Sequence, residues 1–218
     1  MAAVTLHYIY DPLCGWCYGA APLAQAAHEM SGVNVVLHGG GMMTGSNRRQ
    51  VTPQWHDYVL PHDQRIAALT GQPFGQPYFD KLLRDTSVVL DSAPPTAAVL
   101  AAERMANKGY EMLHHVQRAH YEQGRKIADV TVLTQCASEI GLDSVAFANE
   151  YAFVNADGLE QHFKHSRALL AKTGGHGFPT FVLETADGSR EIVQTVEFLG
   201  NMTAWRAFLQ IKIGDLVA

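Results

Sequence analysis

Residues 11–22 read DPLCGWCYGAAP and carry two of the chain's three cysteines, Cys14 and Cys17. The residues just before them, 4–10 (VTLHYIY), alternate and are rich in β-formers, which predicts a strand. The apolar spacing after Cys14 is helical, and residues 33–38 (VNVVLH) are again strand-like. The cysteine pair therefore stands where a strand passes into a helix, inside a β-α-β unit with parallel strands.

This position favours a redox role for the pair. At the start of a helix, unpaired backbone NH groups and the positive helix end stabilise a thiolate, which is the nucleophilic form of cysteine. A second cysteine one turn further along can resolve a mixed disulfide by attack within the same molecule. We therefore predict that Cys14 is the nucleophile and Cys17 the resolving thiol.

A metal site and a pair of inert core cysteines are the two alternatives to a redox role. Zinc would need two more ligands, and the sequence has no second Cys-x-x-Cys and no Cys-His cluster. His162 and His165 could join a site, but paired histidines on the surface of a helix are common. Cys136 stands alone on a predicted helix, where we expect it to be buried and inert. We expect no metal and no cofactor other than the redox-active pair itself.

The middle of the chain, residues 52–172, lacks convincing strands and is predicted to be helical. Ser92 followed by Pro94 and Pro95 is typical of a helix start, with a capping hydroxyl and prolines in the first turn. That helix is predicted to end at Gly109, a candidate C-cap. Further helices are predicted over residues 110–124, 130–141, 143–154 and 156–172.

The last part of the chain returns to strands. Residues 180–185 (TFVLET) and 190–196 (REIVQTV) flank the dipeptide Asp187-Gly188, one of the strongest short signals for a hairpin. Asn201 is placed to cap a terminal helix. The core-facing side of that helix is predicted to carry Met202, Trp205, Phe208 and Leu209.

The element order is thus β-α-β, a helical block, then β-β-α, and it resembles the thioredoxin fold with a large helical insertion, as in DsbA-like proteins. The motif after the first strand, Pro22 five residues beyond it, and GFPTF at 177–181 carry the resemblance across nearly the whole chain. DPLCGWCYG looks especially like FrnE-type members, relatives of 2-hydroxychromene-2-carboxylate isomerases and kappa-class glutathione transferases. We predict a thioredoxin-like domain of residues 1–48 and 174–218, and an inserted helical domain of residues 49–173.

The resemblance implies an α/β thiol-disulfide oxidoreductase or protein-disulfide isomerase acting on protein or glutathione disulfides. In the family, a cis-proline loop faces the two sulfurs and pairs with bound substrate. By resemblance, Pro179 is that proline, and Phe178 would hold the substrate in an extended pose. Trp16 is either a substrate-facing aromatic or a packed ring, and His176 either assists proton transfer or is an ordinary loop residue.

Two features depart from better-known relatives. Thioredoxins and DsbA carry a buried acid at the position of Tyr8. Asp11 is nearby in the sequence, but we expect it to organise the loop or cap the helix rather than to replace that acid. The dipeptide Gly15-Trp16 also offers no cation to the nucleophile, so the resemblance does not imply a strongly oxidising protein.

Composition limits the partners and leaves two alternative functions. The net charge of -5 and the absence of a basic patch argue against nucleic acid and membrane partners. No targeting segment or long apolar run is visible, so we expect a cytoplasmic protein. The alternatives are a glutathione-dependent transferase or isomerase, whose relatives generally have serine at the first motif position, and a binding protein with a groove. Aromatic and methionine residues that could line such a groove, or simply form core, are Met42, Met43, Trp55, Tyr78 and Phe79.

Overall fold

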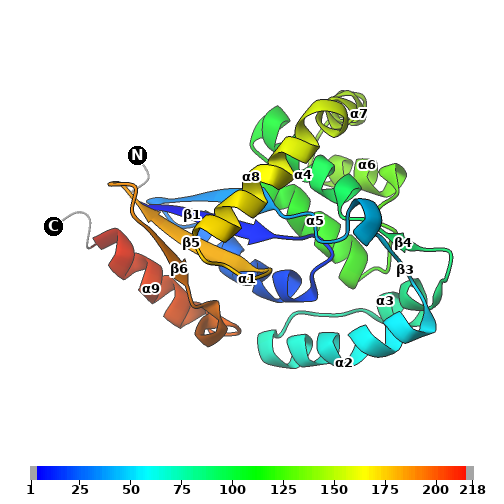
Figure 1. Cartoon of the computed structure of the whole chain (residues 1–218), viewed down its shortest axis with the longest axis horizontal. Helices are drawn as coiled ribbons and strands as arrows, with labels where there is room; N and C mark the ends of the chain where they lie inside the picture. Colours follow the sequence, from blue (N-terminus) through cyan, green and yellow to red (C-terminus); the bar gives the residue numbers. More distant parts are fainter. Residues whose placement is uncertain (1–3, 215–218) are drawn as a thin grey trace.

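The computed structural model describes residues 4–214, and its centre is a four-stranded sheet (Figure 1). The strand order is β2-β1-β5-β6, with β1 and β2 parallel and the other neighbours antiparallel. This is the thioredoxin-like sheet that the family resemblance implies. The strands are β1 (Val4–Tyr10), β2 (Val33–Gly39), β5 (Thr180–Thr185) and β6 (Arg190–Val193).

Helices cover the sheet and gather at one end of it, on the right in Figure 1. Helix α1 (Gly15–His28) connects β1 to β2, and α9 (Met202–Gly214) ends the described chain. Between β2 and β5 lie α2 (Pro53–Thr70), α3 (Gln76–Asp80), α4 (Ala93–Ala106), α5 (Gly109–Tyr121), α6 (Val130–Glu139), α7 (Ser144–Phe153) and α8 (Leu159–Lys172). Short helical turns occupy Gly45–Asn47, Leu82–Arg84, Val154–Gly158 and Thr195–Phe198.

The alternation of β1 sends its side chains to two different helical layers. The indole of Trp205 on α9 donates to the carbonyl of Leu23 on α1 at 2.8 Å, which joins the helices of one layer. On the other face α8 crosses the sheet (Figure 1), and His162 accepts a hydrogen bond from the backbone NH of Gly39 in β2 at 2.9 Å. The sheet is therefore enclosed on both faces.

One prediction about the middle of the chain is wrong: residues 52–172 contain one short strand, and its two-residue partner lies just before them, at residues 49–50. β3 (Arg49–Gln50) pairs antiparallel with β4 (Val89–Leu90), and the NH of Val51 extends the ladder to the carbonyl of Val88 at 2.9 Å. Two-residue strands are too short to show a period of two in the sequence. The ladder joins the loop after β2 to the segment before α4.

The predicted cap of α4 is also wrong. The Ser92 side chain makes no capping hydrogen bond, and the carboxylate of Asp91 accepts the NH of Ala93 instead, at 2.9 Å. The helix ends at Ala106, and its C-cap is Asn107 rather than Gly109, because Asn107 adopts the left-handed conformation, with φ 55°. Asparagine tolerates this region better than most residues. Gly109 is the first residue of α5.

The C-terminal elements confirm the turn chemistry. Gly188 has φ 83°, and Asp187 accepts the NH of Ser189 at 3.0 Å, which closes the hairpin between β5 and β6. Asn201 accepts the NH of Ala204 at 3.1 Å, as expected of a cap. Trp205 and Leu209 are fully buried, and Met202 and Phe208 pack against the core.

The division into residues 1–48 with 174–218 and an insertion of residues 49–173 stays a prediction. Over the described part of the chain, no helix has both the length and the apolar composition required to cross a membrane.

Candidate active site

The Cys-x-x-Cys pair lies at the N-terminus of α1. Cys14 is the N-cap residue, with φ -91° and ψ 113°, and its carbonyl accepts the NH of Tyr18 at 3.1 Å. The Cys14 side chain makes no capping hydrogen bond, and the N-terminal end of α1 begins directly after it. Both cysteines are free thiols; Cys14 is 8% exposed and Cys17 is completely buried. Of the two cysteines, only Cys14 has exposed surface.

The loop before β5 faces Cys14. The peptide bond between Phe178 and Pro179 is cis, and the Cys14 thiol donates to the carbonyl oxygen of Phe178 at 3.5 Å. Tertiary folding thus brings together two segments separated by 164 positions in the sequence. The backbone of Phe178 lies where a substrate chain bonded to Cys14 could pair with it.

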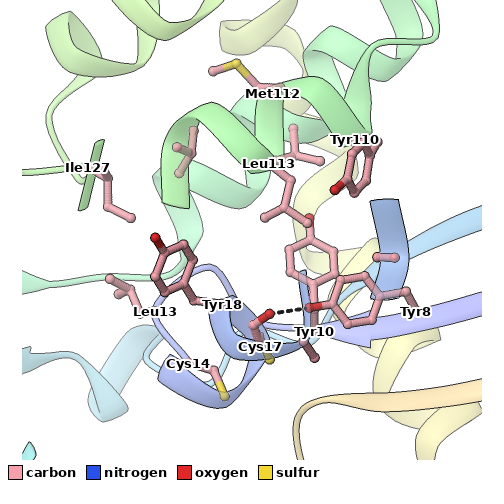
Figure 2. Packing of buried hydrophobic residues seen from close by; sticks show 14 of the residues in the cluster. Tyr8, Tyr10, Leu13, Cys14, Cys17, Tyr18, Tyr110, Met112, Leu113 and Ile127 are labelled. Carbon is pink, nitrogen blue, oxygen red and sulfur yellow. Dashed lines mark hydrogen bonds between the residues drawn. The ribbon is translucent and has the colours of Figure 1, made fainter. Parts of the chain in front are cut away.

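Cys17 lies in a polar but closed environment. The backbone NH of Asp11 donates to its sulfur at 3.4 Å, and the Tyr8 hydroxyl donates to its carbonyl at 2.8 Å (Figure 2). Burial, together with the neighbouring Cys14 thiol, raises the pKa of Cys17 well above its usual value. Burial likewise raises the pKa of Tyr8, so this phenol stays protonated. Cys17 is therefore held in its protonated form.

The Asp11 carboxylate ties three segments to the site. It accepts the NH of Leu13 at 2.9 Å, the NH of Met42 at 2.6 Å and the Ser92 hydroxyl at 2.8 Å. Burial raises the pKa of Asp11 to about 6, and these hydrogen bonds limit the rise. The geometry is that of a loop organiser, and it uses the Ser92 hydroxyl that the sequence assigns to a cap.

A cavity of about 620 Å³ opens beside Cys14. Its size is in the range of ligand pockets. Trp16 is half-buried in its wall, and the guanidinium groups of Arg48 and Arg49 are exposed at its mouth. Its wall also contains Met42, Met43, Trp55 and Tyr78 from the predicted groove set, but not Phe79.

Asp63 is a polar residue of this cavity that the motifs of the sequence do not single out. It is 5% exposed, and its Oδ2 accepts the Tyr78 hydroxyl at 2.8 Å. Burial raises the pKa of Asp63 to about 6. The signal was present in α2, where Val59, Asp63 and Ile66 share one buried face at helical spacing. An acid at a core position of an amphipathic helix is a reason to expect a special role.

Within the described residues, no hydrogen bond joins the remaining candidate residues to Cys14 or Cys17. His176 is exposed and does not line the cavity. His162 bonds the backbone of β2, while His165 bonds Gln161 at 2.9 Å on the surface. In the described part of the chain, no three His, Cys, Asp or Glu side chains are grouped so as to hold a metal ion. Cys136 is fully buried, and burial raises its pKa to about 11.

The fold and the thiol pair define the class of protein. The profile of the DSBA-like thioredoxin domain matches residues 5–203. The chain belongs to this family and is a thiol-disulfide oxidoreductase with a helical insertion in its thioredoxin fold.

Solved structures give more particular similarities. The chain is 53% identical to the cytosolic disulfide reductase DsbM from Pseudomonas aeruginosa, over 96% of this chain and 98% of that one, with a TM-score of 0.91. A structure of that DsbM with GSH is 50% identical, over 96% and 99% of the two chains, with a TM-score of 0.89. A 2-hydroxychromene-2-carboxylate isomerase shares the fold at 15% identity, over 97% and 98% of the chains, with a TM-score of 0.59. A comparison with curated proteins finds no match.

Proposed function

We propose that this protein is a glutathione-coupled disulfide reductase in which Cys14 is the nucleophile and Cys17 the resolving thiol. The observation that carries the proposal is the position of Cys14. Its sulfur lies at the N-terminus of α1, borders the cavity and contacts the Phe178 carbonyl beside cis-Pro179. Cys17 has no exposed surface from which to start the reaction.

The reaction proceeds in two exchanges. The Cys14 thiolate attacks a substrate disulfide R–S–S–R′, forming the mixed disulfide Cys14–S–S–R, and R′S⁻ leaves and takes up a proton. Cys17 then loses its proton and attacks the Cys14 sulfur, releasing RS⁻, which is protonated in turn. The substrate gains two electrons, and the protein is left with a Cys14–Cys17 disulfide.

Glutathione would return these electrons. Two molecules of glutathione reduce the protein disulfide to two thiols and leave as glutathione disulfide, which balances the cycle. The cavity beside Cys14 supports this step, because Arg48 and Arg49 at its mouth can pair with carboxylates of the tripeptide. The similarity to a DsbM solved with GSH supports the same co-substrate.

Reduction rather than oxidation is the proposed direction, in a cytosolic compartment. The DsbM relative is a cytosolic disulfide reductase, and a reducing cytoplasm favours reduction. Phe178 and Pro179 would bind the substrate chain, with Trp16 contacting it from the cavity side. The transferase or isomerase alternative has the weaker support, since the isomerase structure shares only the fold.

Single cysteine variants test the proposal. Cys14→Ser should abolish turnover of both insulin disulfides and a glutathione mixed disulfide. Cys17→Ser should abolish insulin reduction and accumulate a mixed disulfide at Cys14, seen as an added glutathione mass. Cys136→Ala is the control and should retain wild-type rates.

Two results would contradict the proposal. Wild-type turnover by Cys14→Ser would remove the nucleophile assignment. Full activity of Cys17→Ser toward a small electrophile with glutathione, without disulfide turnover by the wild type, would favour the transferase alternative.

A further inference from the structure

We propose that Asp63 is a positioning residue that acts through Cys14: its carboxylate destabilises the Cys14 thiolate and so makes the pair a stronger reductant. This inference rests on the proposed function, because it concerns Cys14 as the reacting thiol. It also gives a structural reason for the reducing direction, which Gly15 and Trp16 leave open.

The Asp63 carboxylate lies at the helix end that carries Cys14. A Cβ atom built on Gly15, the first residue of α1, would lie 2.6 Å from Asp63 Oδ1. Gly15 directly follows Cys14, so this oxygen lies against the same helix end as the nucleophile. Both Cys14 and Asp63 line the cavity beside the thiol.

One oxygen of the Asp63 carboxylate accepts no hydrogen bond from the described residues. Tyr78 donates to Oδ2 at 2.8 Å, while nothing within residues 4–214 donates a hydrogen bond to Oδ1. Oδ1 keeps accessible surface in the cavity, but because the residue is only 5% exposed, water screens this oxygen less than it screens a carboxylate on the open surface. The negative charge on Oδ1 therefore acts on groups at the N-terminal end of α1.

Asp63 carries a negative charge near neutral pH. Burial raises its pKa to about 6, and the Tyr78 hydroxyl and His62 oppose the rise. Asp63 is therefore mostly ionised at pH 7 to 8. The buried groups around it, Tyr78, Tyr121 and His120, are neutral there, since burial raises the pKa of the phenols and lowers that of His120 to about 3. The other charged or titratable side chains of the cavity are exposed: Arg48, Arg49, Tyr58 and His62.

Ionised Asp63 changes the stability of the Cys14 thiolate. The positive N-terminal end of α1 stabilises a negative charge placed near it. When the Asp63 carboxylate is that charge, it also repels a second negative charge, the Cys14 thiolate, at the same helix end. Cations exposed to water at the cavity mouth offset this repulsion only weakly. The Cys14 thiolate is therefore less stable than it would be at this helix end without Asp63.

The redox consequence follows from the balanced exchange, in which the protein disulfide and two glutathione molecules give two thiols and glutathione disulfide. The thiolate exists only in the reduced protein. Destabilising it shifts this equilibrium toward the protein disulfide, which means that the reduced protein gives up its electrons more readily.

Asp63→Asn tests the inference, because an amide carbonyl can still accept the Tyr78 hydroxyl. We expect the pH of half-maximal Cys14 alkylation by iodoacetamide to fall by about one unit, as for loss of a neighbouring like charge. The equilibrium constant with glutathione should move about tenfold toward the dithiol. Asp57→Asn is the matched control: it removes a carboxylate that is exposed on the same helix, and both values should stay at wild type.

A second variant covers misfolding of the first. Tyr78→Phe removes the hydrogen bond that favours the ionised carboxylate, so it should move both values in the same direction as Asp63→Asn, but less. The inference would be overturned if, in either folded variant, the equilibrium constant with glutathione stayed within twofold of wild type and the pH of half-maximal alkylation did not change. A shift of either quantity in the opposite direction would also overturn it. That result would leave the reductase proposal standing, whereas turnover by Cys14→Ser would overturn the reductase proposal whatever Asp63→Asn does.

Discussion

Gly15, inside the active-site motif, is required by packing rather than by redox chemistry. A Cβ there would meet Asp63 Oδ1 at 2.6 Å and Ile66 Cδ1 at 3.1 Å. One turn later a Cβ on Gly19 would lie 2.6 Å from Ile66 Cγ2. The two glycines, four residues apart, share one face of α1 and let α2 approach the active-site helix closely. The motif therefore contains a packing signal as well as two thiols.

Gly15→Ala should therefore destabilise the protein by about 1–3 kcal/mol, the usual cost of overpacking. Chemical denaturation followed by circular dichroism measures this change. Gly158→Ala is the control, because its Cβ would meet nothing within 4 Å, and its stability should equal or slightly exceed wild type. In an Asp63→Ala background the cost of Gly15→Ala should shrink, since one of the two clashing groups is gone. An equal cost in both backgrounds would contradict the assigned clash.

At the scale of elements, helix ends show where local sequence rules hold and where they fail. Asp129 and Asp143 cap α6 and α7 through their own carboxylates, and the donors to these carboxylates lie only two or three residues further along the chain. Ser92 has the same capping potential, but Asp11 and the NH of Met43 occupy its hydroxyl. The capping rule therefore predicts where a helix starts, but tertiary contacts determine which side chain is available to accept the capping hydrogen bond.

The end of α4 gives a prediction at this scale. Asn107 holds the left-handed C-cap position, with φ 55°. Asn107→Gly should raise the free energy of unfolding by less than about 1 kcal/mol, and Asn107→Ala should lower it by about 1 kcal/mol, because only glycine adopts this conformation without strain. Thermal or urea unfolding measures both. The same sign for the two variants would show that the backbone conformation does not control this site.

At the scale of the whole molecule, several histidines are enclosed as neutral groups. Burial lowers the pKa of His38 and of His120 to about 3 and that of His162 to about 4. His38 also shares a 2.9 Å hydrogen bond with His7 across β1 and β2. In the unfolded chain such side chains would take up protons below about pH 6.5.

The protein should therefore lose stability as the pH falls from about 6.5 to 5. Three histidines bind protons only when unfolded over this range, so the unfolded state is favoured at the lower pH. The raised pKa values of Asp11 and Asp63, both about 6, act in the opposite direction, because these carboxyls bind protons in the folded state first. The three histidines outweigh the two carboxyls, and the expected net loss is about 1–2 kcal/mol per pH unit.

Urea unfolding at several pH values measures this slope. Asp63→Asn should make it steeper, because one of the opposing carboxyls is gone. A stability that is constant or rises toward pH 5 would contradict the assignment of these histidines as buried and neutral.

Local signals in the sequence predict the β-α-β start, the β-β-α end and the location of the thiol pair. Alternation in residues 4–10, the Asp187-Gly188 turn and the Asn201 cap are local signals, and local backbone preferences obey them. The Cys-x-x-Cys at a strand-helix junction predicts that Cys14 lies at a helix N-terminus, without any tertiary contact. The short ladder between β3 and β4 left no such signal.

The surroundings of those thiols depend on contacts between segments that are far apart in the sequence. Asp11 meets Ser92 across 81 positions, and Cys14 meets Phe178 across 164, so no local rule can pair them. Asp63 was visible as an acid on a buried helix face, but its neighbour depends on how α2 packs on α1. Burial, which sets the charge of each group, is a property of the whole fold, and for this reason the chemical environment of the site could not be read from the motif alone.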